Sequence, residues 1–442
     1  MITFANLLHN AQYISRKSRK QSFKLRGFPD EERIRGFSWL PQYHDLGLVM
    51  CTLTPFVSGW RMGYLSPLDF IRRPLLWLHL LSEERAIFSC APDFSLRLCV
   101  RKWWVNQSTP EAQASMVQAL NLSALIWIQN GAEPIRASSF RDFGSAFAAL
   151  GLKPSYPGVA YGLAEHVVGV CAREPNVAGS TLSDVSDEDL ECVGVLDDLS
   201  EGSKCIIVDP VTRREMAVGE VGELWLSSPS VAAGYWGKPE MTEEAFAARV
   251  SRASEGASGD DSRETCLRTG DLARIDRAGR IFICGRIKDL IIVRGRNIYP
   301  QDVEFAAQEA SDIVRPGCIA AFSSSELGGE LEVVMEVRKS AEQDASFLTE
   351  GMEAVRRAVI AEGCYPYRLV AIRERTIPKT TSGKIQRRRT RQLLHAGQLE
   401  VITELTAPVR MTPWDHFPAL RRSPRPLPPR LRPPKIFLPN KI

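Results

Sequence analysis

A carboxylate followed by a group of cations is the most informative chemical feature of this chain. Asp271 stands in the segment LRTGDLARIDRAGRIFICGRIKDLIIVRGRNIYPQDVE, residues 267–304, and it precedes the basic side chains Arg286, Lys288, Arg294 and Arg296. A carboxylate can accept hydrogen bonds from both hydroxyls of a ribose, and fixed cations can hold phosphate oxygens. The segment therefore predicts a nucleotide site at the junction of two domains.

A second candidate is the run YGLAEH, which joins an aromatic ring to a carboxylate four residues later. The ring of Tyr161 could stack on adenine, and the carboxylate of Glu165 could hold Mg²⁺ against phosphate oxygens. Taken alone, the run is equally typical of a loop with a core tyrosine and a surface glutamate.

A third candidate is Lys384, in the loop PKTTSGKIQRRR at residues 378–389. A loop can carry an ammonium group into a site and withdraw it later. At an α-phosphorus this charge would oppose the negative charge that builds up during attack by a carboxylate. The alternative interpretation is a solvated run of basic residues.

The segment 267–304 contains three short motifs in succession. TGD, then GRIKD, then RGRNIYPQD resemble the adenylate-forming enzymes, and the ending YPQD resembles their fatty acyl-AMP ligase branch. The resemblance implies that Asp271 binds the ribose hydroxyls and that Arg286 helps to hold the same nucleotide. Lys288 would be the hinge between a large and a small domain, where a long polar side chain stays solvated in both orientations.

The same resemblance implies roles for the other candidates. Tyr161 would face the adenine, Glu165 would bind the magnesium, and Lys384 would be the catalytic lysine. The run NGAEP resembles the backbone strip on the other side of the adenine, formed by Asn130, Gly131, Ala132 and Glu133.

The run SWLPQYHDLGL, residues 38–48, resembles the acyl-pocket segment of the family. His44 would lie near the carboxylate and the α-phosphate, although a lone histidine is as often structural. Trp39, Leu46 and Met50 fit either a lipid pocket or an ordinary core.

The elements that must position these residues predict a multidomain α/β protein. Residues 1–35 read as a helix followed by a basic loop from Arg16 to Arg26, and Ser123–Ile128 reads as a buried strand that opens into the NGAEP loop. We expect an adenylate-forming fold with three parts: the remainder of a large domain at 1–285, a small α+β lid domain at 286–395, and a disordered Pro/Arg-rich tail at 396–442.

The bulk properties exclude several classes of protein. Removing the seven Lys and Arg of residues 421–442 from the formal charge of +4 leaves −3, so nucleic-acid binding is not expected. The ten cysteines form no CxxC pair, which favours buried thiols in the cytoplasm. No apolar run is long enough to span a membrane, and no signal peptide is recognisable.

The function implied is ATP-dependent and Mg²⁺-dependent activation of a fatty acid to an acyl-adenylate. The acyl group would pass to an acyl carrier protein or to the carrier domain of a polyketide synthase. An acyl-CoA synthetase is the alternative among enzymes. A non-catalytic acyl- or nucleotide-binding remnant is the alternative of another class. It is favoured by the lack of the Ser/Thr/Gly-rich phosphate loop, which the family places before the segment that ITFANLLHNAQYI resembles. A third reading is a tail that docks on SH3-like grooves through RPLPPRLRPP.

Overall fold

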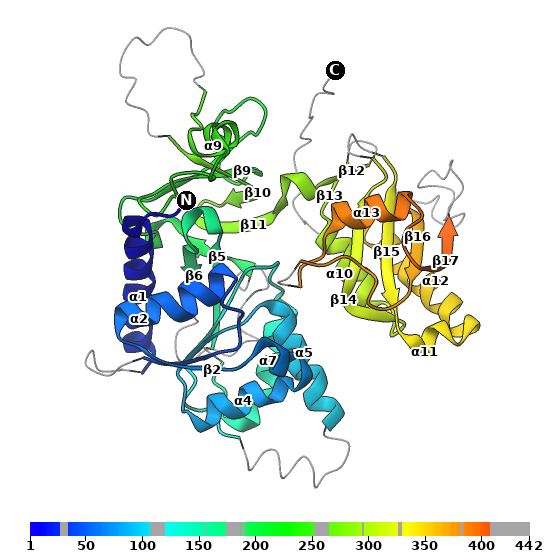
Figure 1. Cartoon of the computed structure of the whole chain (residues 1–442), viewed down its shortest axis with the longest axis horizontal. Coiled ribbons are helices and arrows are strands. Elements are labelled where there is room, and N and C mark those ends of the chain that lie inside the picture. The colour runs from blue at the N-terminus through cyan, green and yellow to red at the C-terminus, as the bar shows by residue number, and fades with distance from the viewer. Residues whose placement is uncertain are drawn as a thin grey trace. The chain divides into compact units, whose positions relative to one another are not determined.

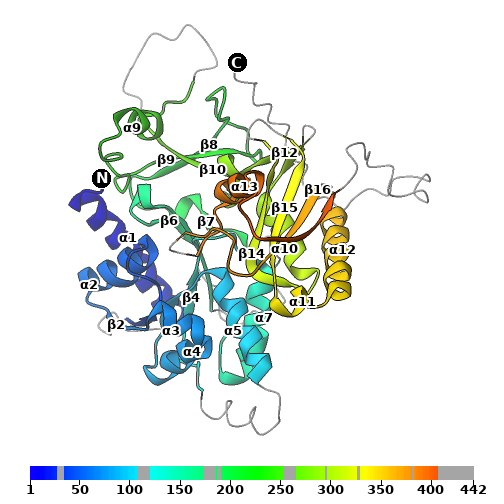
Figure 2. The same ribbon diagram turned by 45° about the vertical axis from the view of Figure 1, so that its right-hand side comes forward.

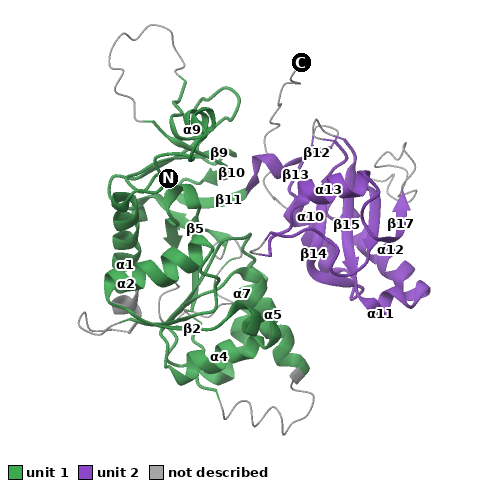
Figure 3. Ribbon diagram, in the orientation of Figure 1, with its two compact units in different colours: residues 1–284 green, residues 285–442 purple. Residues whose placement is uncertain are grey.

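The computed structural model describes residues 1–26, 34–106, 120–154, 156–173, 186, 191–251, 265–293, 296–325, 329–380 and 383–406. The chain divides into two compact units, Met1–Cys284 and Gly285–Ile442, which Figure 3 shows in different colours. Each unit has its own hydrophobic core.

The first unit is built on a six-stranded sheet in the order β2-β1-β3-β4-β5-β6. Neighbouring strands run parallel except β6, which is antiparallel to β5. Central strands such as β4 are buried along their whole length, as is usual in parallel sheets covered on both faces. The strands are β1 (Arg35–Ser38), β2 (Arg61–Tyr64), β3 (Phe88–Cys90), β4 (Trp127–Asn130), β5 (Pro157–Gly162) and β6 (Gly169–Arg173).

Helices α4 (Pro74–Glu83), α5 (Asp93–Asn106) and α7 (Ala137–Phe147) lie together beside this sheet (Figures 1 and 2). α5 and α7 meet through aromatic rings, for example Trp103 of α5 against Phe147 of α7 at 5.1 Å between ring centroids. The Trp77 indole N–H donates to Ser89 Oγ at 3.2 Å, so this fully buried ring still satisfies its polar atom. Shorter helices α2 (Thr54–Ser58) and α3 (Pro67–Arg72) precede them.

Helix α1 (Phe4–Arg26) is longer than the sequence predicts. The expected basic loop from Arg16 to Arg26 is wrong, because helical backbone continues through it. The reason is that Ile14 and Ser18 continue the buried stripe at a spacing of four residues, while Lys17 pairs with Asp198 at 2.8 Å. The basic residues that we expected to be solvated by a loop therefore include one that anchors a helix.

A second, antiparallel sheet of the first unit has the order β7-β11-β10-β9-β8. β10 and β11 are joined by the polar turn DRAG, residues 276–279, in which Gly279 takes a φ of +73° that favours glycine. Helix α9 (Pro239–Phe246) follows β9. The strands are β7 (Gly194–Val195), β8 (Lys204–Val208), β9 (Gly222–Ser227), β10 (Leu267–Ile275) and β11 (Arg280–Arg286).

The second unit is α+β. A hairpin of β12 (Ile291–Val293) and β13 (Arg296–Ile298) precedes a sheet of order β14-β15-β16-β17. β15 is buried at every residue and forms the centre of that sheet. The other elements are β14 (Val314–Ser323), β15 (Leu331–Val337), β16 (Pro366–Ile372), β17 (Val401–Thr406), α10 (Pro300–Glu309), α11 (Lys339–Glu342), α12 (Ala345–Ala361) and α13 (Arg387–His395).

Two boundaries differ from the prediction. The strand expected at Ser123–Ile128 lies at Trp127–Asn130, because the Asn121 side chain accepts from Ser123 N and turns the backbone before it. The tail expected at 396–442 begins with an ordered segment, since β17 pairs antiparallel with β16. The Pro/Arg-rich part of the tail lies outside the described residues.

Within the described ranges, no helix is long and apolar enough to cross a membrane. All ten cysteines are free thiols, and all except Cys284 are buried.

Candidate nucleotide and acyl-activation site

The two sheets of the first unit meet at a buried hydrogen bond between two predicted site residues. Tyr161, near the end of β5, donates its hydroxyl to Asp271 Oδ2 of β10 at 2.6 Å. Both side chains are almost fully buried. Burial, and next to it the Asp271 carboxylate, raise the pKa of Tyr161 well above its ordinary value, so the phenol remains a donor. The structure thus brings together the residues expected at adenine and at ribose.

The TGD motif is a bulge in β10, which explains why Asp271 points at β5. The register between β10 and β9 shifts between Arg268 and Leu272, and Gly270 has a φ of +71°. Glu223 of β9 fixes the bulge by accepting from Gly270 N at 3.1 Å and from Arg268 Nε at 3.0 Å. Glu223 is a site-supporting residue that the sequence analysis missed, because only the strand pairing reveals it.

Removing the Tyr161 hydroxyl tests the strength of this link. We expect Tyr161→Phe to lower the free energy of unfolding by about 1–3 kcal/mol, because the buried Asp271 carboxylate loses a donor. Urea unfolding at pH 7 measures it. Tyr64→Phe is the matched control, since its hydroxyl donates to Cys51 O at 2.8 Å but the residue is 47% exposed. Equal losses in the two variants would contradict the account.

The NGAEP strip lies next to Tyr161's strand, because Asn130 of β4 is paired with Val159 of β5. A Cβ at Gly131 would stand 2.8 Å from the carbonyl oxygen of Ala160, so glycine permits this close approach. Ala132 follows with a φ of +69°, a conformation that non-glycine residues rarely adopt. The strip is therefore held close against β5 and turns sharply away from it.

Among the residues of this strip, Asn130 has the side chain best suited to form hydrogen bonds with a ligand. It is fully buried, yet neither its amide oxygen nor its amide nitrogen has a hydrogen-bond partner among the described residues. Buried polar groups are nearly always paired, so an orphaned amide needs an explanation. A planar heterocycle with donor and acceptor atoms would provide one.

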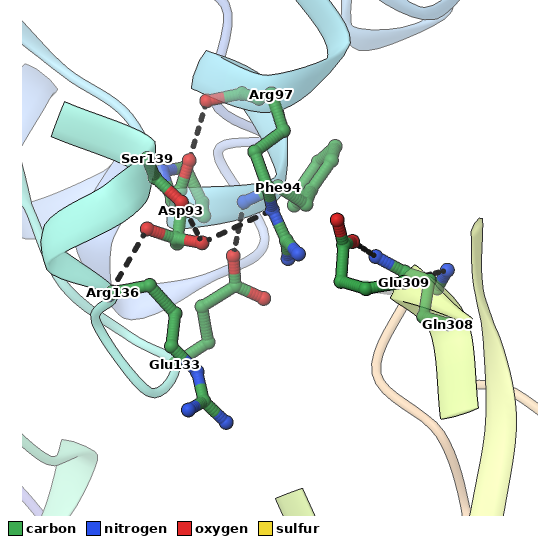
Figure 4. A network of polar contacts seen from close by, with 11 residues as sticks. Asp93, Phe94, Arg97, Glu133, Arg136, Ser139, Gln308 and Glu309 are labelled. Carbon is green, nitrogen blue, oxygen red and sulfur yellow. Dashed lines mark hydrogen bonds and ion pairs between the residues drawn. The ribbon is translucent and has the colours of Figure 1, made fainter. Parts of the chain in front are cut away.

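Glu133 has a different role from the one its position suggests. Its Oε1 accepts from the backbone N–H of Phe94 at 2.6 Å, at the first turn of α5 (Figure 4). A carboxylate there satisfies a free helix donor and is stabilised by the helix dipole. The side chain of Glu133 is thus occupied by α5, and its backbone remains the part that could face a nucleotide.

Glu165, the predicted magnesium ligand, lies in a short 3₁₀ turn (Ala164–His166) that follows β5. Its Oε1 accepts from the Tyr235 hydroxyl at 2.8 Å, and its backbone carbonyl accepts from Ala232 N at 2.8 Å. The carboxylate is half-buried. Mg²⁺ is usually held by one or two carboxylates together with substrate phosphates, so a single fixed carboxylate fits such an ion. No group of three or more potential metal ligands occurs in the described part of the chain.

The neighbouring His166 is a buried structural residue. Asn10 of α1 lies between His166 Nδ1, at 3.4 Å, and the carbonyl of Gly169, at 2.8 Å. Burial lowers the pKa of His166 from 6.5 to about 4, so the ring is neutral in the folded protein. This network fixes the end of the Glu165 turn on helix α1.

The lowered pKa of His166 makes stability depend on pH. Because the folded pKa of about 4 lies below the unfolded value of 6.5, the contribution is complete above pH 6.5 and is lost as the pH falls toward 4. Relative to His166→Gln, we expect the wild type to lose about 2 kcal/mol of unfolding free energy between pH 7.5 and pH 5. Urea unfolding of both proteins at these two pH values measures the difference. Parallel pH dependence of the two proteins would contradict a neutral buried ring.

His44 lies just before a helical segment that the sequence did not predict. Its Nδ1 lies 2.6 Å from Asp45 Oδ1 and 3.2 Å from Leu46 N, at the start of a π-helix (Leu46–Leu53). π-Helical turns are rare and often occur at functional sites. Trp39, in contrast, stacks on Phe70 at 3.8 Å between ring centroids, with both rings buried. This contact favours the core interpretation of Trp39 over the lipid-pocket one.

The second unit carries the remaining predicted residues. Lys384 is exposed and lies in a tight turn, in which Gly383 has a φ of +84° and Lys384 O accepts from Thr380 N at 2.8 Å. Arg286 is exposed at the end of β11, and Lys288 is exposed in the 3₁₀ turn Ile287–Asp289 that follows. The predicted hinge is therefore a short polar turn between a strand of one sheet and a hairpin.

Arg296 is the other residue of the basic group that the structure describes. Arg296 Nη1 donates to Gly363 O at 2.9 Å, beyond the end of α12, and Arg294 lies outside the described residues.

Comparison with known proteins agrees with this geometry. Residues 1–236 match the family of AMP-binding enzymes. The chain therefore belongs to that family, and its relatives place it in the fatty acyl-AMP ligase branch of the adenylate-forming enzymes.

Two curated relatives carry the similarity over most of the chain. A medium-chain-fatty-acid–[acyl-carrier-protein] ligase of Moorena producens is 34% identical over 90% of this chain and 66% of its own length. A long-chain-fatty-acid–AMP ligase of Mycobacterium marinum is 34% identical over 79% of this chain and 60% of its own length. The chain thus spans about two thirds of these relatives.

Among solved structures, a fatty acyl-adenylate ligase from work on the enzymes of E. coli and L. pneumophila superposes with a TM-score of 0.70. It is 26% identical, and the alignment covers 90% of this chain and 66% of that one. The α/β adenylate-forming fold expected from the motifs is confirmed.

Proposed function

We propose that this chain activates a fatty acid with ATP, giving acyl-adenylate and pyrophosphate, and that the acyl group then passes to the thiol of an acyl carrier protein. The buried Tyr161–Asp271 hydrogen bond carries the proposal, since it joins an aromatic face to a carboxylate at the meeting of two strands. The relatives named as fatty-acid–[acyl-carrier-protein] and fatty-acid–AMP ligases support the choice of substrate and acceptor.

The nucleotide would be read by residues of the first unit. Asp271 accepts from Tyr161 through Oδ2, and a carboxylate has enough lone pairs to accept from a ribose hydroxyl as well. The orphaned amide of Asn130 could pair with the edge of the adenine, and Gly131 holds the strip close against β5. Arg286 would add a cation to the same nucleotide.

The proposed roles of the residues in the reaction follow from their charges. A carboxylate oxygen of the fatty acid attacks the α-phosphorus, the bond from that phosphorus to the bridging oxygen breaks, and pyrophosphate leaves. Lys384 would offset the negative charge that develops at phosphorus, and His44 would orient the attacking carboxylate. Glu165 would hold Mg²⁺, which offsets phosphate charge when bound. Lys288, in the turn between a strand and a hairpin, would act as the hinge.

The acceptor is tested by competition. The purified chain is given ATP, Mg²⁺ and fatty acids of graded length, and then either CoA or a phosphopantetheinylated acyl carrier protein. We expect acyl-AMP in every reaction and acyl transfer to the carrier alone. Acyl-CoA as the product would favour the synthetase alternative. A folded chain that forms no acyl-AMP would favour the non-catalytic one.

A further inference from the structure

A tyrosine outside every motif considered so far controls the carboxylate of Glu165. Tyr235 lies 70 residues away in the sequence, in the turn between β9 and α9, and its hydroxyl donates to Glu165 Oε1 at 2.8 Å. Phenol-to-carboxylate hydrogen bonds are charge-assisted and therefore stronger than neutral ones. One of the two carboxylate oxygens of Glu165 is thus fixed by a residue of the turn between β9 and α9.

The ring of Tyr235 is itself held on α9. It packs edge-on against Phe246 at 5.1 Å between ring centroids. Its backbone N–H donates to Thr242 Oγ1 at 2.9 Å. Gly234 allows this fit, because a Cβ there would stand 2.2 Å from Thr242 Cγ2. These contacts with α9 fix the direction in which the Tyr235 hydroxyl points.

The segment before Tyr235 is anchored to the rest of the unit as well. Asn6 of α1 donates from Nδ2 to Pro229 O at 2.7 Å and to Val231 O at 3.0 Å. Ala232 N–H donates to the carbonyl of Glu165 at 2.8 Å. The same loop thus fixes both the backbone and the side chain of Glu165.

The Glu165 turn needs this support because it ends in strained backbone. Val167 has a φ of +66° and a ψ of −69°, and Val168 N donates to His166 O at 2.8 Å, which closes a γ-turn. A β-branched residue in this region is disfavoured and persists only where its surroundings hold it. The carboxylate would otherwise be free to rotate on a strained turn.

We propose that Tyr235 is a positioning residue for metal binding by Glu165. Its hydroxyl holds Oε1, so that the other oxygen faces the Mg²⁺ that accompanies ATP. This inference rests on the proposed function. Residues that hydrogen-bond a metal-binding carboxylate typically change metal affinity 10- to 100-fold when they are removed.

The test measures binding, without turnover. Calorimetric titrations compare ATP in the presence of Mg²⁺ with ATP in EDTA, for the wild type, Tyr235→Phe, Glu165→Gln and the double variant. We expect Tyr235→Phe to raise the Kd for Mg·ATP by about tenfold and to leave the Kd for metal-free ATP unchanged. The double variant should bind Mg·ATP as Glu165→Gln does, because Tyr235 acts only through Glu165. Tyr13→Phe, which loses a hydroxyl bond of 3.1 Å to Asp198 O, is the matched control.

The possible failures are distinguishable. A Tyr235→Phe protein that keeps the wild-type preference for Mg·ATP overturns the inference and leaves the proposed function intact. An equal loss for both forms of ATP also overturns it, since that result means general loosening of the loop. A folded wild type that binds neither form overturns the proposed function, and the inference with it.

Discussion

We expect Lys384→Ala to lower the rate of acyl-AMP formation by at least about a hundredfold, the usual cost of removing one charge-stabilising group from a transition state. The ammonium group would offset negative charge at the α-phosphorus, and alanine cannot. Because Lys384 is exposed, its removal should change the unfolding free energy by less than about 0.5 kcal/mol. Single-turnover acyl-AMP formation and urea unfolding measure the two effects.

Another exposed lysine of the second unit offers a control for this variant. Lys339→Ala removes an exposed lysine of α11 in the same unit and should leave the rate unchanged. Formation of acyl-AMP by Lys384→Ala at the wild-type rate would remove Lys384 from the proposed mechanism. The two lysines differ in setting, because Lys384 follows Gly383, with a φ of +84°, whereas Lys339 is the first residue of the short helix α11.

The second large effect is expected at Arg387, three residues after Lys384. Its guanidinium contacts Glu304 through Nε and Nη2, at 2.6 and 2.8 Å, and Asp289 through Nη1 at 2.6 Å. Burial acts to lower the pKa of Arg387, but the carboxylates of Glu304 and Asp289 hold it above its ordinary value. Arg387 thereby ties the start of α13 to α10 and to the turn that holds Lys288.

We expect Arg387→Met to destabilise the second unit by about 2 kcal/mol, between the costs of breaking an exposed and a buried ion pair, because the group is half-buried and two carboxylates would lose their cation. Native-state hydrogen exchange of the β15 amides reports the opening of this unit.

Arg373→Met is the matched control, since Arg373 is 55% exposed and pairs with Glu342 and Glu400 at the surface. Exposed pairs contribute little, so its loss should destabilise the second unit clearly less than Arg387→Met does. Similar losses in Arg373→Met and Arg387→Met would mean that the Arg387 network is no more than a surface pair.

The candidate site residues could be chosen from the sequence alone, because each belongs to a short contiguous run. YGLAEH and NGAEP begin at the ends of strands, and TGD forms a bulge within β10. The fold class followed from the same runs. The predicted roles of the site residues remain predictions that the experiments above address.

What the sequence could not reveal are the contacts that connect these runs. Tyr235 reaches Glu165 across 70 residues, and Asn10 reaches His166 across 156. No local pattern encodes either contact, since each depends on how a loop or helix packs on a distant turn. The capping role of Glu133 was missed for the same reason, because its partner Phe94, in the first turn of α5, lies 39 residues earlier.

Local backbone predictions failed where tertiary contacts overrode a simple pattern. The basic run after Arg16 suggested a loop, but Ser18 is buried and Lys17 pairs with Asp198, so the helix continues. The Pro/Arg composition near the C-terminus suggested disorder from 396, yet Leu405 packs on the core of the second unit and β17 completes the sheet.

The most direct measurement follows phosphorus from ATP into the product. The purified chain is incubated with a long-chain fatty acid, Mg²⁺ and ATP labelled at either the α- or the γ-phosphate. The account predicts a fatty acyl product that carries the α-label, with the γ-label released in pyrophosphate. A fatty acyl product that carries the γ-label, or a folded chain that yields no labelled acyl product, would contradict acyl-adenylate formation.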